Sequence, residues 1–200
     1  MVKVMTNHVR FSLFFAFSFL VLMVPVLSAQ AKRIEYGVKG GVPLNNIVTT
    51  SGSIQDDTYG VTAGGAIELH LPLLFSIEAN AIYKRPGYWD IDGTIERKRF
   101  SQWEFPIMGK VYPLGRNPAI QPYASAGMSF RRLSTSFFGS EADAGLVTAI
   151  GVRNGPGRIK FPLELRYTRW LGETPLIQGS QGPTAWLNQN QIEFLVGLIF

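Results

Sequence analysis

The sequence predicts an all-β protein, an eight-stranded antiparallel up-and-down transmembrane β-barrel. Eight stretches of alternating apolar and polar residues follow one another, their connections are alternately long and short, and the last stretch ends in an aromatic residue, Phe200. Successive side chains of a strand point to opposite faces, so each stretch has one apolar and one polar face. Strands that cross a bilayer at a tilt need about 9–11 residues, which these stretches provide.

The first 31 residues are typical of a secretory signal peptide. A basic start precedes the apolar run 11–27, and the small-x-small pattern within 28–31 suits cleavage by signal peptidase. An uncleaved membrane anchor is the alternative, because the run is close to the minimum length for a spanning helix. Pro25 and the Ala-x-Ala pattern argue against the anchor. We expect residues 1–31 to be removed and residues 32–200 to form a barrel domain in the bacterial outer membrane.

The first four predicted strands occupy residues 34–42, 58–70, 73–84 and 103–111. Alternation is clearest in the third, and each of the four carries at least one charged residue on its polar face. We expect these side chains to face outward: Ile34, Tyr36, Val38, Val42, Tyr59, Val61, Ala63, Ile67, Leu69, Leu73, Phe75, Ile77, Ala79, Ala81, Tyr83, Trp103, Phe105, Ile107 and Val111.

The last four predicted strands occupy residues 120–132, 143–153, 159–167 and 191–200. The fifth strand is rich in small residues, and we assign its face from Met128 and Phe130. These side chains should face outward: Ala124, Ala126, Met128, Phe130, Ala144, Leu146, Ile150, Val152, Ile159, Phe161, Leu163, Leu165, Tyr167, Ile192, Phe194, Val196, Leu198 and Phe200. Three prolines fall inside predicted strands, where β-bulges are the expected accommodation: Pro106, Pro122 and Pro162.

The connections differ in length in a regular way. The long ones are polar or glycine-rich and occupy residues 43–57, 85–96, 133–141 and 171–187. The tight ones are residues 71–72, 114–118 and 154–157. Outer-membrane barrels have short periplasmic turns and longer outer loops, so this rhythm predicts that both chain ends lie on the periplasmic side.

The polar faces of the predicted strands carry many charges. An eight-stranded barrel is just wide enough for its own side chains, so enclosed opposite charges should pair and fill it. A selective pore or a proton path is the alternative. The side chains expected in this interior network are Glu35, Lys39, Glu68, Glu78, Lys84, Glu104, Lys110, Asp143, Arg153, Glu164, Arg166 and Glu193.

Four short motifs resemble the PorT-like outer-membrane β-barrel family. They are residues 103–112, 121–127, 163–167 and 197–200, and the resemblance extends over the whole chain after the signal peptide. The family also places a proline after the Glu-aromatic pair of its fourth strand, as at Pro106. The resemblance implies the barrel fold, and the family's named member implies a link to protein secretion as one alternative function. It also implies that the assembly machinery recognises aromatic residues of the last strand, here Phe194 and Phe200.

No residue pattern indicates catalysis, a cofactor or a metal site. The chain has no cysteine, which excludes a disulfide framework and a cysteine-based metal site. His70, the only histidine beyond the signal peptide, is expected at a surface or interfacial position beside a tight turn. The net charge of +5 belongs partly to the first 31 residues, so it does not favour nucleic-acid binding.

We therefore expect a monomeric, non-enzymatic barrel with a structural or surface-binding role. Its expected partners are outer-membrane lipids, lipopolysaccharide and the outer-membrane assembly machinery. Lipopolysaccharide phosphates could contact the basic clusters at 131–132 and 97–99, and a partner or ligand could contact the loop 171–187. A small lipid-modifying enzyme is an alternative that requires a serine, a histidine and a carboxylate to converge. A secreted soluble sandwich or lipocalin-like binder is another, and it requires an apolar interior and a polar exterior.

Overall fold

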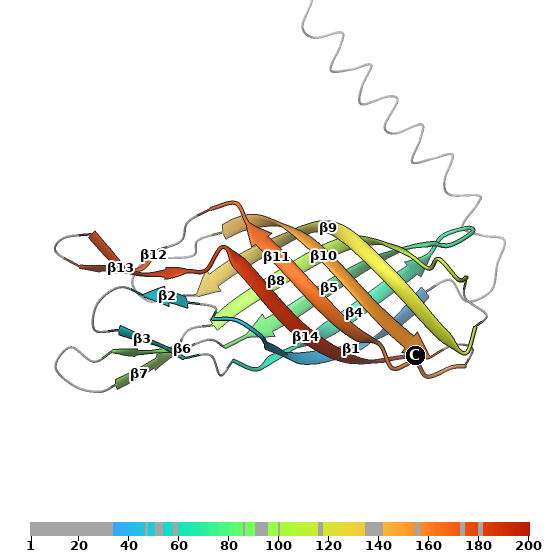
Figure 1. Cartoon of the computed structure of the whole chain (residues 1–200), viewed down its shortest axis with the longest axis horizontal. Helices are drawn as coiled ribbons and strands as arrows, with labels where there is room; N and C mark the ends of the chain where they lie inside the picture. The colour runs from blue at the N-terminus through green and yellow to red at the C-terminus, as the bar shows by residue number, and fades with distance from the viewer. Residues whose placement is uncertain are drawn as a thin grey trace, which may run out of the picture. The chain divides into compact units, whose positions relative to one another are not determined.

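The computed structural model describes residues 34–46, 48–50, 54–57, 60–85, 87–90, 96–99, 101–115, 118–134, 142–154, 157–172, 175–179 and 182–200. The predicted signal peptide and its cleavage site lie outside these residues, as does Tyr59. Residues 34–200 form one compact unit, in which eight strands close into an antiparallel barrel (Figure 1). The predicted fold class is confirmed.

The barrel strands follow one another around the wall in sequence order. Their bounds are β1 (Ile34–Pro43), β4 (Thr62–His70), β5 (Phe75–Lys84), β8 (Ser101–Val111), β9 (Ile120–Ser134), β10 (Ala142–Asn154), β11 (Leu163–Trp170) and β14 (Asn190–Ile199). The order around the wall is β1-β14-β11-β10-β9-β8-β5-β4. Every barrel strand therefore pairs with its predecessor and successor, and β14 pairs with β1 to complete an up-and-down barrel.

The closing seam between β1 and β14 runs from Gly37, opposite Ile199, to Pro43, opposite Glu193. Beyond it, the Phe200 N–H donates to the Tyr36 carbonyl at 2.8 Å. A Cβ added at Gly37 would collide with the backbone of β14, which explains a glycine there. The closed seam leaves neither β1 nor β14 with a free edge, so the barrel has no edge for unwanted strand pairing.

Exposure alternates along the barrel strands in the predicted phase. The outward side chains are apolar and the inward ones are largely polar or charged. The facing of β9 is confirmed: Ala124 and Phe130 are exposed, whereas Tyr123 and Ser125 are buried. Leu73 is exposed as predicted, but it lies in the turn before β5, with φ of 65°, and not in the strand. Among the described residues, no helix is long and apolar enough to cross a membrane.

The long connections contain strands that the sequence pattern did not reveal. These are β2 (Val48–Thr50), β3 (Ile54–Asp57), β6 (Gly87–Asp90), β7 (Glu96–Arg99), β12 (Pro175–Gly179) and β13 (Gly182–Leu187). They form two three-stranded sheets, β12-β13-β2 and β3-β6-β7. Treating these segments as plain loops was wrong. Strands of three to six residues are too short to show the alternation of a strand, and their pairing partners lie in other connections, far away in the sequence.

The three prolines are accommodated without bulges. The register of β8 with β5 is the same on both sides of Pro106, where two ladder pairs are simply missing. At Pro122, β9 extends past the end of β8 and pairs only with Val152 of β10. Pro162 precedes β11, and its carbonyl accepts a hydrogen bond from Gly197 at 2.9 Å. The expected bulges were therefore wrong, since strand ends and one gap in the ladder suffice.

Candidate functional site

Charged side chains from all eight barrel strands and from the β10–β11 turn meet inside the barrel. Among the described residues, this interior network joins seven carboxylates and seven cationic side chains, together with His70. The carboxylates are Glu35, Glu68, Glu78, Glu104, Asp143, Glu164 and Glu193. The cations are Lys39, Lys84, Lys110, Arg131, Arg153, Lys160 and Arg166.

Lys39 of β1 occupies the middle of the network. Its Nζ donates to Glu78 Oε1 of β5 at 2.6 Å and to Glu164 Oε2 of β11 at 2.8 Å. Neither β5 nor β11 is a neighbour of β1 in the wall, because β4 and β14 lie between. Both ion pairs therefore cross the lumen.

Other groups saturate the same carboxylates. Arg166 donates to Glu164 Oε1 through Nη2 at 2.6 Å and through Nε at 2.9 Å, while the Tyr123 hydroxyl donates to Oε2 at 2.9 Å. Lys110 pairs with Glu78. A buried carboxylate is costly unless its oxygens are paired and hydrogen-bonded, and these contacts meet that requirement.

A second group of side chains closes the end of the barrel at the short turns. Arg153 reaches Glu35 at 3.0 Å, and Lys160 pairs with the same carboxylate. Glu68 accepts from the hydroxyls of Ser76 and Tyr112, both at 2.6 Å. Tyr112 directly follows β8, and burial raises the pKa of its phenol above the usual value, which keeps it a donor.

His70 belongs to this turn-side group. It is buried, with Nε2 2.9 Å from Glu35 Oε1 and Nδ1 3.4 Å from Glu68 Oε1. The surface or interfacial position expected from the sequence is therefore wrong, because the inward phase of β4 carries this side chain into the lumen. A serine, a histidine and a carboxylate do converge here, but the Ser76 hydroxyl donates to Glu68. That hydrogen bond does not make Ser76 a nucleophile activated by His70.

The loop-side half of the lumen has its own pairs. Lys84 contacts Glu104 and lies 2.8 Å from Glu193. Arg131 donates to Asp143 at 2.7 Å, and its guanidinium stacks 4.3 Å from the ring centre of Trp170. The buried Trp170 ring and this pair fill the lumen near the ends of β9, β10 and β11.

All twelve side chains that the sequence analysis named lie in this interior network. The network also contains residues that the sequence analysis did not assign to it. Arg131 was assigned to a basic cluster at the rim, yet it is 1% exposed, whereas Arg132 is exposed. The alternation of β9 would have shown this, since Arg131 shares the phase of Tyr123 and Ser129. Tyr112 was missed because it lies just beyond the end of β8, whereas Lys160 was not named although the predicted strand 159–167 gave it the inward phase of Glu164. The side chains of 97–99 lie outside the described residues.

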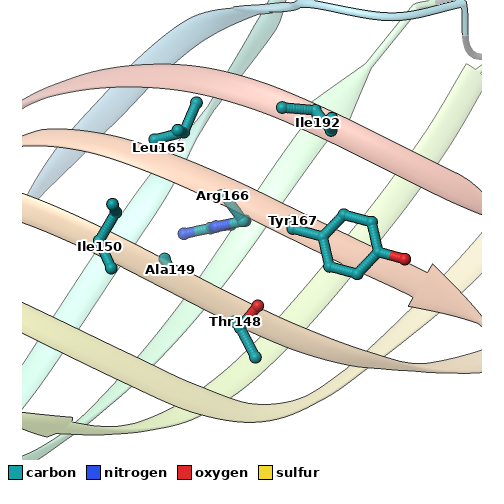
Figure 2. A pocket seen from close by; sticks show the side chains of 7 residues that line it. All are labelled: Thr148, Ala149, Ile150, Leu165, Arg166, Tyr167 and Ile192. Carbon is teal, nitrogen blue, oxygen red and sulfur yellow. The ribbon is translucent and has the colours of Figure 1, made fainter.

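A shallow depression lies on the exterior of the barrel, on the wall formed by β10, β11 and β14 (Figure 2). We call it the exterior groove; its volume is about 270 Å³ and most of its lining atoms are apolar. Its lining residues are Thr148, Ala149, Ile150, Leu165, Arg166, Tyr167 and Ile192. Ala149 and Arg166 are buried, whereas the other five are exposed. The groove therefore opens to the outside.

The proposed assembly residues also lie on the exterior. Phe194 and Phe200 are exposed by 39% and 43%, and the Phe200 ring lies 6.3 Å from the Tyr36 ring across the seam. Within the described part of the chain, no group of three or more histidine, cysteine, aspartate or glutamate side chains is arranged to hold a metal ion.

Solved structures share this fold, although sequence comparisons find no relative. No protein-family model and no curated protein matches the chain, so the PorT-like resemblance stays a prediction. Neisserial surface protein A matches with a TM-score of 0.50 and 13% identity, over 83% of this chain and 94% of that chain.

Two further structures match less well. The N-terminal β-barrel domain of OprF from Pseudomonas aeruginosa has a TM-score of 0.49 and 13% identity, over 86% of this chain and all of that chain. Ail, the attachment invasion locus protein of Yersinia pestis, solved with the heparin analogue sucrose octasulfate, has a TM-score of 0.46 and 12% identity, over 84% of this chain and all of that chain. Neisserial surface protein A is an eight-stranded outer-membrane barrel, and the chain shares that fold.

Proposed function

We propose that the chain is a non-enzymatic β-barrel of the bacterial outer membrane with a structural or surface-binding role. The observation that carries this proposal is the inverted polarity of the barrel. Tyr36 and Ile150 are each 62% exposed, whereas Lys39 and Glu78 are 4% and 1% exposed. A soluble sandwich or lipocalin-like binder requires the opposite arrangement, since a continuous apolar exterior of this size is not stable in water. A bilayer is the solvent that suits this exterior.

The proposed partners follow from the same surfaces. Lipid chains would cover the apolar wall, and lipopolysaccharide phosphates suit exposed arginines such as Arg132 at the loop-side ends of the strands. The assembly machinery would act on β14 through Phe194 and Phe200. The barrel is proposed to work as a monomer, without a cofactor or nucleic acid, after export by a cleaved signal peptide.

The filled lumen supports a barrel that does not conduct. Ion pairs from Lys39 cross the lumen, and Tyr123 and Trp170 are buried inside it. Because an eight-stranded barrel has just enough room for its own side chains, we expect no conductance steps above baseline from the protein in planar bilayers. Regular single-channel steps that follow protein insertion would contradict the filled lumen.

Cell fractionation and heat-modifiable gel mobility test the location. The expected result is recovery in the outer-membrane fraction, with unheated protein migrating differently from boiled protein, since the closed barrel resists detergent unfolding. Recovery in the soluble periplasm without a mobility shift would refute the proposed function.

A further inference from the structure

The exterior groove ends, on the loop side, in polar side chains. Arg169 follows Tyr167 by two residues on the same face of β11, and Asn190 of β14 lies directly opposite it in the register. Both side chains are exposed. With a rise of about 3.3 Å per residue, Arg169 lies about 7 Å beyond Tyr167 along the strand. An apolar groove thus leads toward a cation and an amide.

Hydrogen bonds hold this end of the groove in place. The Tyr167 hydroxyl donates to Asn190 Oδ1 at 2.7 Å, which fixes the ring as a wall of the groove. The Asn190 N–H donates to Asn188 Oδ1 at 2.9 Å, and its carbonyl accepts from Asn45 Nδ2 at 2.6 Å. Because Oδ1 of Asn190 is already an acceptor, its Nδ2 group remains as the donor end of the amide.

We propose that the exterior groove binds one acyl chain of an anionic phospholipid, whose phosphate contacts Arg169 and Asn190. This inference rests on the proposed membrane location. A guanidinium binds phosphate oxygens through two parallel hydrogen bonds, and the opposite amide supplies a further donor. The order of the groups matches a lipid of the loop-side leaflet, with its chain toward the middle of the wall and its headgroup toward the loops.

The dimensions of the groove favour a single hydrocarbon chain. Its volume of about 270 Å³ is below the ~300–1,000 Å³ typical of pockets that enclose a whole small molecule. Thr148 provides a small side chain at the bottom, directly between Ala126 of β9 and Tyr167 of β11 in the register. Ile150 and Leu165, also paired, form the other wall (Figure 2).

Lipid retention by the purified full-length barrel tests the groove. The protein is equilibrated with phosphatidylglycerol or phosphatidylcholine, and native mass spectrometry counts the lipid that stays bound. We expect wild type to retain one phosphatidylglycerol and T148F, which fills the groove, to lower that retention about tenfold. A63F places the same side chain on the exposed face of β4, outside the groove, and should retain lipid like wild type.

The headgroup contact needs a separate pair of variants. R169Q should abolish the preference for phosphatidylglycerol over phosphatidylcholine, whereas R158Q, which changes an exposed arginine in the turn between β10 and β11, should preserve it. Equal retention by T148F and A63F would overturn the proposal, as would an equal preference in R169Q and wild type. Displacement of the lipid by inorganic phosphate alone would also overturn it, because the site would then bind a free anion.

Heat-modifiable mobility, measured on each variant first, separates this proposal from the proposed function. Wild type without a mobility shift would refute the membrane barrel itself, whereas a folded barrel that fails the lipid comparison refutes only the groove. If T148F does not fold, T148L fills less of the groove and makes the same comparison, with a smaller expected loss of retention.

Discussion

At the scale of single residues, the interior is organised around carboxylates that serve several strands. Glu78 of β5 accepts from Lys39 of β1 and from Asn80 at 2.9 Å, and it also pairs with Lys110 of β8. Removing one partner of a buried ion pair leaves the other charge uncompensated. Replacing Glu78 should therefore leave two buried cations, Lys39 and Lys110, with one partner fewer.

We predict that E78L destabilises the barrel by about 3–5 kcal/mol, because it leaves Lys39 and Lys110 with one carboxylate fewer. Urea unfolding in lipid vesicles, followed by tryptophan fluorescence, measures the free energy of unfolding. A79L changes the neighbouring exposed residue of the same strand and should remain near wild type. Equal stability of the two variants would show that the network contributes little.

Gly37 offers a test of the seam. An added Cβ at this position would collide with the Leu198 carbonyl and with Ile199, whereas one at Gly65 would lie 3.9 Å from the nearest atom, the Gly37 carbonyl. We expect G37A to lose about 1–3 kcal/mol through overpacking and G65A to lose much less. Vesicle unfolding curves distinguish them, and an unaffected G37A would mean that the seam readily widens.

At the scale of elements, the sequence predicted the strands that form the barrel wall. It did not predict which inward side chains pair with one another across the lumen. Period-two alternation was enough to place Lys39, Glu78 and Glu164 on inward faces. Which of them meet depends on the closure and stagger of the barrel, and these are not local properties of any strand. Sequence alternation alone therefore left the pairing of Lys39 open.

The same distinction explains the other departures. The strands within the long connections are short and pair with distant segments, as β2 does with β13. The location of Arg131 inside the lumen followed from alternation, but a pair of adjacent arginines suggested a rim cluster. The accommodation of Pro122 depended on where β8 ends, and element ends are the least certain part of a sequence-based assignment.

The last strand offers a prediction about assembly. We expect F200A to reduce the amount of barrel recovered from the outer membrane, because Phe200 extends the β1–β14 seam and is the proposed recognition residue. Immunoblots of outer-membrane fractions measure this. F161A removes another exposed exterior aromatic, and deletion of residues 173–185 removes β12 and part of β13; both should assemble better than F200A. Equal recovery of F200A and F161A would remove the special role of Phe200.

At the scale of the whole molecule, inside and outside should differ in their access to lipid. The chain has four tryptophans, of which Trp103 is 45% exposed on the wall and Trp170 is 1% exposed in the lumen. We predict that brominated lipids quench a variant that retains only Trp103 much more than one that retains only Trp170. Comparable quenching of both would contradict the inverted polarity, and quenching of neither would indicate a barrel that does not enter the bilayer.

The ion pairs of Lys39 also have a consequence for the order of folding. Its two carboxylates lie 39 and 125 residues further along the chain. A partly folded sheet that reaches only from β1 to β9 can offer Lys39 the first carboxylate but not the second, which arrives with β11. Contacts between such distant residues are slow to form, because long loops must close first. The interior charges should thus be completed in one late cooperative step, when β14 joins β1, and until then the growing sheet must keep them hydrated.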